Sequence, residues 1–294
     1  MGSVFALSSA FFWACGVILF AKSGDNFSPI SLNIYKSIVA LVLVTLTMLI
    51  LHIPFFPEFP LNSWLLLALS GFVGITLADI FFFTALNKLG AGLVAIVECL
   101  YLPSVLFFSF ILLDEKLGTG GIIGSLLVLS AVFVGSVTKK EMAKKNKISR
   151  NTILGIISGI LAMVFLALGI VIIKEVLEQS NVFWATYVRV TAGCISLFVI
   201  ALCHPRRRQY FRELKFSRAW ITALPASVCG NFVALILWVA GMKYTTASQA
   251  AILNQMSSIF IFILAAVFLK EKITTNKILA ICLAVTGACL TIFT

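Results

Sequence analysis

The sequence predicts an all-α membrane protein in which ten transmembrane helices form two inverted five-helix repeats. Three observations lead to this fold class. The 294 residues are 61% hydrophobic and only 11% charged, whereas a soluble domain carries about 25% charged residues. The apolar residues gather in long runs, and the second half of the chain repeats the pattern of the first. A bilayer accommodates so much apolar surface because lipid is itself an apolar solvent.

Ten apolar runs are long enough to cross a bilayer, which takes roughly 17–25 helical residues. Strands are not expected, because only helices and closed barrels satisfy their backbone hydrogen bonds in lipid, and barrel strands alternate polar and apolar residues. These runs are apolar on every face, which favours helices. The expected spans are 3–22, 30–52, 63–86, 92–113, 118–138, 152–174, 182–204, 218–241, 247–269 and 275–294.

An internal repeat divides the chain. The stretch from Trp64 to Lys116 aligns without gaps with the stretch from Trp220 to Lys272, at a constant offset of 156 residues. We therefore expect a first repeat over 1–138, a basic linker over 139–150 and a second repeat over 151–294. Five helices are an odd number, so the second half must enter the membrane upside down relative to the first. Inverted repeats of this kind occur in many secondary transporters.

The basic residues predict the orientation in the membrane. The formal net charge is +11, but Lys and Arg sit mainly in short connectors, so nucleic acid is not an expected partner. One side of the predicted bundle receives 17 Lys and Arg residues near the helix ends, and the other side receives 3. Cytoplasmic loops carry the excess of positive charge. We therefore expect the 139–150 and 206–218 loops in the cytoplasm and both termini outside.

Several chemical classes find no support in the sequence. The seven cysteines show no CxxC spacing, so we expect neither a disulfide framework nor a metal site. Patterns of the GxGxxG, Walker A or HExxH type are absent, so no cofactor and no catalytic residues are expected. The first apolar run begins without a basic segment, which argues against a cleaved signal peptide.

Two turn motifs carry a family resemblance. Leu112-Leu113-Asp114-Glu115-Lys116 and Phe268-Leu269-Lys270-Glu271-Lys272 each close the fourth helix of a half, and a fifth helix rich in small residues follows. With the stretch from Gly74 to Gly92, these residues make the whole chain resemble the EamA group of the drug/metabolite transporter superfamily. The resemblance implies transport of small metabolites such as amino acids, sugars or nucleotide conjugates. Many members of that group keep both termini inside, in contrast to the orientation expected here.

Four ionisable residues are predicted to lie deep in the membrane, where a charge costs ~2.5–3.5 kcal/mol at a helix centre. They are Lys36, Asp79, Glu98 and Arg189. Asp79 and Glu98 should both lie ~13 Å from the turn that joins their helices, because an α-helix rises 1.5 Å per residue. Repulsion between two facing carboxylates would favour a proton on one of them. The alternatives are a structural hydrogen bond between the helices or a salt bridge with Lys36.

Lys36 and Arg189 lie near the starts of related helices in the two halves. Together they could hold an anionic group of a substrate, or each could extend its charge to the membrane interface. Glu98 aligns with Asn254, which Gln255 follows, so these amides could line a polar cavity or join helices by hydrogen bonds. Tyr101 lies one helical turn after Glu98 on the same face. Tyr35 and Tyr187 are further candidates, although Tyr and Trp, including Trp13 and Trp238, often mark the membrane interface.

These features favour a secondary active transporter of small metabolites in the cell (inner) membrane that works by alternating access. The substrate class would be an amino acid, a sugar or an organic anion. Protons are a candidate coupling ion, with Glu98 as their carrier, but facilitated exchange fits the sequence equally well. A passive channel and an intramembrane lipid-handling enzyme are the further alternatives. The expected partners are the substrate and the lipid bilayer, with the protein as a monomer or homodimer.

The expected orientation can be tested by labelling. In a background without the seven native cysteines, we expect Thr294→Cys to react with a membrane-impermeant thiol reagent in intact cells and Lys145→Cys to react only after lysis. The reason is the bias of positive charge toward the cytoplasmic loops. Labelling of position 145 but not 294 in intact cells would show the opposite orientation.

Overall fold

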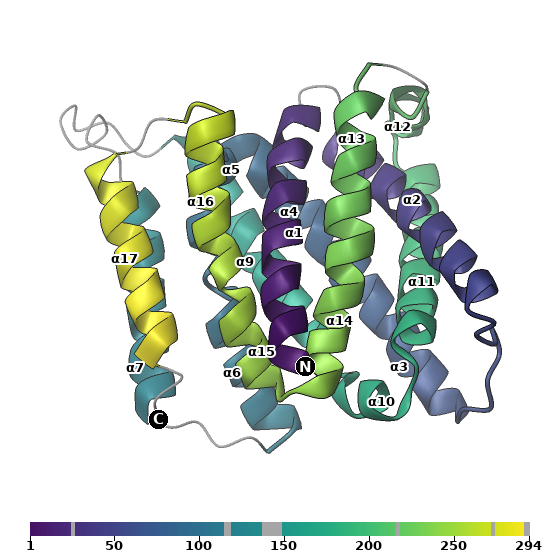
Figure 1. The fold of residues 1–294 in the computed structure, drawn as a ribbon. Coiled ribbons are helices and arrows are strands. Elements are labelled where there is room, and N and C mark those ends of the chain that lie inside the picture. The colour runs from purple at the N-terminus through teal and green to yellow at the C-terminus, as the bar shows by residue number, and fades with distance from the viewer. Residues whose placement is uncertain (25–26, 115–118, 137–148, 216–217, 272–273, 291–294) are drawn as a thin grey trace.

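A computed structural model describes residues 1–24, 27–114, 119–136, 149–215, 218–271 and 274–290, which form helices joined by short connectors (Figure 1). No strand occurs among these residues. Two of the elements, η1 and η2, are π-helical. The described helices are α1 (Gly2–Ser23), α2 (Pro29–Ile50), α3 (Leu61–Gly71), η1 (Phe72–Leu77), α4 (Ala78–Leu89), α5 (Ala91–Glu98), α6 (Tyr101–Leu112), α7 (Thr119–Ser136), α9 (Arg150–Val171), α10 (Lys174–Gln179), α11 (Val182–Cys203), α12 (Arg207–Glu213), α13 (Trp220–Ala226), η2 (Ser227–Val233), α14 (Ala234–Tyr244), α15 (Ala247–Asn254), α16 (Met256–Phe268) and α17 (Thr275–Leu290).

Eight helical segments of the described residues are long and apolar enough to cross a membrane. They run over 22 to 29 residues, and about 20 residues span the hydrocarbon core. Large apolar side chains such as Val42, Leu46 and Val199 are exposed on the outside of the bundle, where lipid rather than water is the fitting solvent. The molecule is therefore an all-α, multi-pass membrane protein. The other two expected spans fall on α7 and α17, which lie side by side (Figure 1).

Four of the eight segments are interrupted, where the sequence predicted continuous helices. Leu61–Leu89 contains η1 and Trp220–Tyr244 contains η2. Ala91–Leu112 breaks between α5 and α6, where Pro103 in the first turn of α6 has no N–H to continue the ladder of hydrogen bonds. Ala247–Phe268 breaks at Gln255. The interruptions recur at about the 156-residue offset of the sequence repeat, so the backbone itself repeats.

Glycines let the interrupted segments approach their neighbours closely. A Cβ atom on Gly16 of α1 would lie 2.7 Å from the Cα atom of Gly230 in η2, and one on Gly169 of α9 would lie 3.0 Å from the Cα atom of Gly74 in η1. Gly74 and Gly230 are themselves 156 residues apart. Small residues at such crossings let helix backbones pack directly in membranes. The first helix of each half thus packs on the π-helical segment of the other half.

Most of the remaining contacts between helices also join elements of one half to elements of the other. Helix α1 packs on α14 and α16, and its counterpart α9 packs on α4 and α6. Helix α2 packs on its counterpart α11, and α7 on α17. The N-terminus lies at the end of the bundle opposite α12 (Figure 1). Because most of these contacts cross between the halves, the centre of the molecule is built by both.

The close approach of α1 to η2 predicts a clear effect of one added methyl group. Gly16→Ala should lower the melting temperature, because its Cβ atom would meet backbone, and overpacking costs about 1–3 kcal/mol. The control is Gly74→Ala, whose Cβ atom would find its nearest neighbours at 3.5 and 3.8 Å, which are ordinary contacts. The measurement is thermal unfolding in detergent, and equal melting temperatures for the two variants would contradict this packing.

Candidate functional site

A cavity of about 90 Å³ lies at the centre of the molecule, between the two halves of the chain. A water molecule occupies about 10–15 Å³ on the same measure, so the cavity has room for several waters or a small solute. Most of its wall is apolar, and a few polar groups converge on it. The lining residues are Ser9, Trp13, Gly74, Ile75, Ala78, Asp79, Phe82, Glu98, Tyr101, Ala162, Met163, Leu166, Arg189, Gly230, Asn231, Ala234, Leu235, Trp238, Asn254, Gln255 and Ser257.

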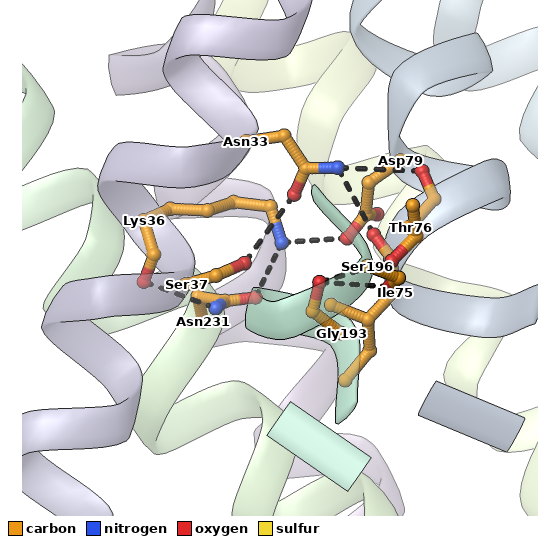
Figure 2. A network of polar contacts seen from close by, with 9 residues as sticks. All are labelled: Asn33, Lys36, Ser37, Ile75, Thr76, Asp79, Gly193, Ser196 and Asn231. Carbon is orange, nitrogen blue, oxygen red and sulfur yellow. Dashed lines mark hydrogen bonds and ion pairs between the residues drawn. The ribbon is translucent and has the colours of Figure 1, made fainter. Parts of the chain in front are cut away.

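A buried ion pair stands at one wall of this cavity (Figure 2). The Lys36 Nζ atom of α2 lies 2.6 Å from Asp79 Oδ2 of α4 and donates to Asn231 Oδ1 of η2 at 2.7 Å. Asn231 returns a hydrogen bond from Nδ2 to the Lys36 carbonyl oxygen at 3.2 Å. The Lys36 side chain is 1% exposed. The ammonium group therefore joins both halves, and Asp79 neutralises its charge.

Further side chains of this network hold η1 in place (Figure 2). Asn33 Nδ2 donates to the carbonyl oxygen of Ile75 at 3.0 Å and to that of Thr76 at 3.4 Å. The Thr76 hydroxyl donates to the carbonyl oxygen of Gly193 on α11 and lies 2.5 Å from the Ser196 hydroxyl. Backbone polar groups that a π-helical segment leaves poorly paired would be costly in lipid. These bonds therefore fix the segment that leads to Asp79.

Glu98 enters the cavity from the end of α5, at the break before α6. Its Oε1 atom accepts a hydrogen bond of 2.7 Å from the indole N–H of Trp13 on α1. The residue is only 7% exposed, and its Oε2 atom has no hydrogen-bond partner among the described residues. One oxygen of this carboxyl group is thus fixed, while the other is left for a proton or a ligand.

Arg189 reaches the cavity from α11 and is 1% exposed. Among the described residues, none accepts a hydrogen bond from its Nε, Nη1 or Nη2 atoms. The guanidinium carbon lies 5.4 Å from the ring centroid of Trp238, whose indole N–H donates to the Tyr101 hydroxyl at 3.2 Å. A cation–π contact gives about 0.5–2 kcal/mol, whereas a buried ion costs several kcal/mol in desolvation. The ring therefore does not offset the burial of this charge.

Several residues that the sequence singled out meet at this cavity. Glu98, Asp79, Arg189 and Tyr101 line it together with Asn254 and Gln255. Gln255 Nε2 donates to the Ser258 hydroxyl at 2.8 Å, while the amide oxygens of Asn254 and Gln255 have no partner among the described residues. The two halves thus contribute unlike polar groups to one wall.

Three predicted site residues lie outside the cavity wall. Lys36 stands behind it, held by Asp79 and Asn231. The Tyr35 ring packs edge-on against Trp220 at 4.8 Å, and the Tyr187 ring packs against Phe55 at 5.3 Å. Of the alternatives left open for Asp79, the structure shows the salt bridge with Lys36. Because Lys36 is paired with Asp79, it is not free to hold an anionic group of a substrate together with Arg189.

Trp13 and Trp238 were expected mainly at the membrane interface, and their place in the cavity wall is a correction to that expectation. Each bonds a predicted site residue, Glu98 or Tyr101. Trp13 lies at the middle of the 22-residue α1, too deep for the interface. The position of Trp13 at the middle of its apolar run could have indicated from the sequence that it lies away from the interface, because interfacial aromatic residues sit at helix ends.

The turn motif of the second half has a role away from the cavity. Both carboxylate oxygens of Glu271 accept from the backbone N–H of Gly92, at 3.2 and 3.1 Å. Gly92 belongs to the first turn of α5, where unpaired N–H groups favour an anion. Gly90, with φ of +76°, precedes that turn. Glu271 thus caps a helix of the other half, while Glu115, Lys116 and Lys272 lie outside the described residues.

The profile of the EamA-like transporter family matches residues 1–137 and 153–293. The chain belongs to this family. Its members transport small molecules across membranes and are not enzymes. No curated protein sequence matches the chain. A solved structure titled only "Crystal structure of protein" is similar, with a TM-score of 0.73 and 15% sequence identity over 98% of this chain and 95% of that one. At this identity the likeness concerns the fold alone.

The ion pair predicts that the two cavity carboxylates differ in their effect on stability. Asp79→Asn should destabilise the protein by about 3–5 kcal/mol, because it leaves the Lys36 charge buried without a counter-charge. Glu98→Gln should unfold at nearly the wild-type temperature, because its amide oxygen can still accept from Trp13. Unfolding in detergent measures both effects.

The double variant Lys36→Met with Asp79→Leu supplies the control. It removes both charges, so it should regain most of the stability that Asp79→Asn loses. A double variant no more stable than Asp79→Asn would show that the charge balance is not the cause.

Proposed function

We propose that this EamA-like transporter is a secondary active transporter with ten membrane-spanning helices in two inverted halves, residues 1–138 and 151–294, joined by the basic linker 139–150. Two separate matches to one family profile support the division. The interruptions that recur at about a 156-residue offset, and the exchanged contacts between halves, support the two-fold relation. The charge bias of the loops favours cytoplasmic 139–150 and 206–218 segments.

The strongest support for alternating access is the position of the cavity. Its wall comes from α1, η1, α4, α5 and α6 of the first half and from α9, α11, η2, α14, α15 and α16 of the second. In transporters built from inverted repeats, the substrate lies near the midplane between the repeats, and rocking of one against the other exposes it to either side. A passive channel would need no such paired construction.

Proton coupling through Glu98 is the finer part of this proposal. The carboxyl group is buried in the cavity wall, and one of its oxygens has no partner among the described residues. An ionisable group in such a place is costly and typically serves transport. The corresponding position in the second half is Asn254, which cannot titrate. A proton can therefore be carried at only one of the two related positions.

Glu98→Gln tests the coupling. Reconstituted into vesicles, the variant should lose accumulation driven by a pH gradient but keep exchange of substrate for substrate, because Gln preserves shape and hydrogen bonding but cannot release a proton. The substrate is a metabolite that raises the melting temperature of the wild type in a panel screen. Glu58→Gln, an exposed carboxylate in the connector after α2, is the matched control and should accumulate normally.

Unchanged accumulation in Glu98→Gln at equal reconstitution would place the coupling elsewhere. If the wild type itself exchanges substrate but accumulates none in a pH gradient, the protein is a facilitative exchanger, and the coupled mechanism is excluded. Uptake that fails to saturate with substrate concentration would instead indicate a channel.

A further inference from the structure

The charges around the cavity do not balance among the described residues. Lys36 and Asp79 neutralise each other at 2.6 Å. Glu98 carries either no charge or one negative charge, depending on its proton. Arg189 then remains, and its three nitrogen atoms find no acceptor, and no carboxylate within 4 Å, among the described residues. When Glu98 holds its proton, the described residues around the cavity carry one uncompensated positive charge.

The surroundings of Arg189 leave space for an acceptor beside its Nη2 atom. The guanidinium carbon lies over the Trp238 ring, 5.4 Å from the ring centroid. Gly74 lies beside Nη2, and even a Cβ atom there would come within 3.5 Å of that nitrogen. Gly74 and Arg189 line the same cavity, and because Gly74 has no side chain, an acceptor in the cavity can approach Nη2. A guanidinium group binds a carboxylate with two parallel hydrogen bonds.

We propose that Arg189 binds a single carboxylate group of the substrate, so that the transported class is small organic monocarboxylates. This inference rests on the proposed transport function and names its substrate class. One carboxylate supplies the one negative charge that the cavity lacks. A phosphate ester with two charges would leave an unpaired anion in a buried site, which is costly. Apolar side chains such as Phe82, Met163 and Leu166 fit the compact apolar body of such a molecule.

Binding to the purified full-length protein in detergent tests the substrate class without any gradient. The probes are 4-methylpentanoate and 3-phenylpropanoate, each paired with its primary amide, and butyl phosphate. We expect at least one carboxylate to raise the melting temperature in a saturable manner, while its amide and butyl phosphate do not. Protection by no carboxylate, equal protection by an amide, or stronger protection by butyl phosphate would overturn the proposal.

Arg189→Gln separates a binding role from a structural one. Without ligand, this variant should melt at or above the wild-type temperature, because it removes a buried charge that has no acceptor among the described residues. Its affinity for the protecting carboxylate should fall about 10- to 100-fold, the range for hydrogen bonds to a charged group. Arg207→Gln, an exposed arginine on α12, is the control and should bind as the wild type does. Unchanged affinity in Arg189→Gln would contradict the proposal.

A second variant keeps the test decisive if Arg189→Gln does not fold. Gly74→Ala preserves the charge of Arg189 and makes only ordinary contacts, so it should fold normally. Because its methyl group fills the space next to Nη2, it should nevertheless bind the carboxylate more weakly than the wild type does. Wild-type affinity in this variant would place the anion elsewhere. The transport experiment remains independent: carboxylate binding without uptake would refute transport alone, and uptake of a different class would refute the monocarboxylate assignment alone.

Discussion

The contact between Lys36 and Asp79 sets the charge balance on which the centre of this protein depends. Two opposite charges at 2.6 Å cancel each other deep among apolar helices, and Asn231 from the other half completes the coordination of the ammonium group. Breaking such a pair is costly because it leaves a buried charge. Once these two charges are neutralised, Glu98 and Arg189 are the charged side chains of the described cavity wall that keep unpaired atoms. The ion pair balances its own charge, and the proposed binding and coupling roles therefore fall to Glu98 and Arg189.

The repeat supplies a scaffold, and the differences between its halves supply the site. Backbone interruptions and close glycine contacts recur at related positions, as for Gly74 and Gly230. The side chains at these positions have diverged. Glu98 corresponds to Asn254, and Phe82 corresponds to Trp238. The backbone of the cavity wall is thus duplicated, while its ionisable and aromatic side chains differ between the two halves.

Much of the fold and of the candidate site was predictable from the sequence, and there are physical reasons why the rest was not. Long apolar runs identify helices because lipid tolerates little else, and burying a charge is so costly that Glu98, Asp79 and Arg189 stood out. Which partner each charge takes depends on helix rotation, which an all-round apolar helix does not reveal. The pairing of Asp79 with Lys36 was therefore one alternative among others, and the bond from Trp13 to Glu98 was missed. The break before α6 had a signal in Pro103, whereas no comparable residue marks Gln255.

The two unpaired groups of the cavity act on each other through their charges. If Glu98 carries the proton and Arg189 the carboxylate, a protonated Glu98 leaves the arginine charge free and strengthens binding of the anion. Linkage is reciprocal, so the bound anion strengthens binding of the proton by the same factor. A form with both ligands is neutral at the centre, as is the empty form with Glu98 ionised, and these two states are the least costly to bury while the halves rock. Carboxylate and proton would then cross in the same direction, and accumulation driven by a pH gradient would follow the inward or outward flow of protons.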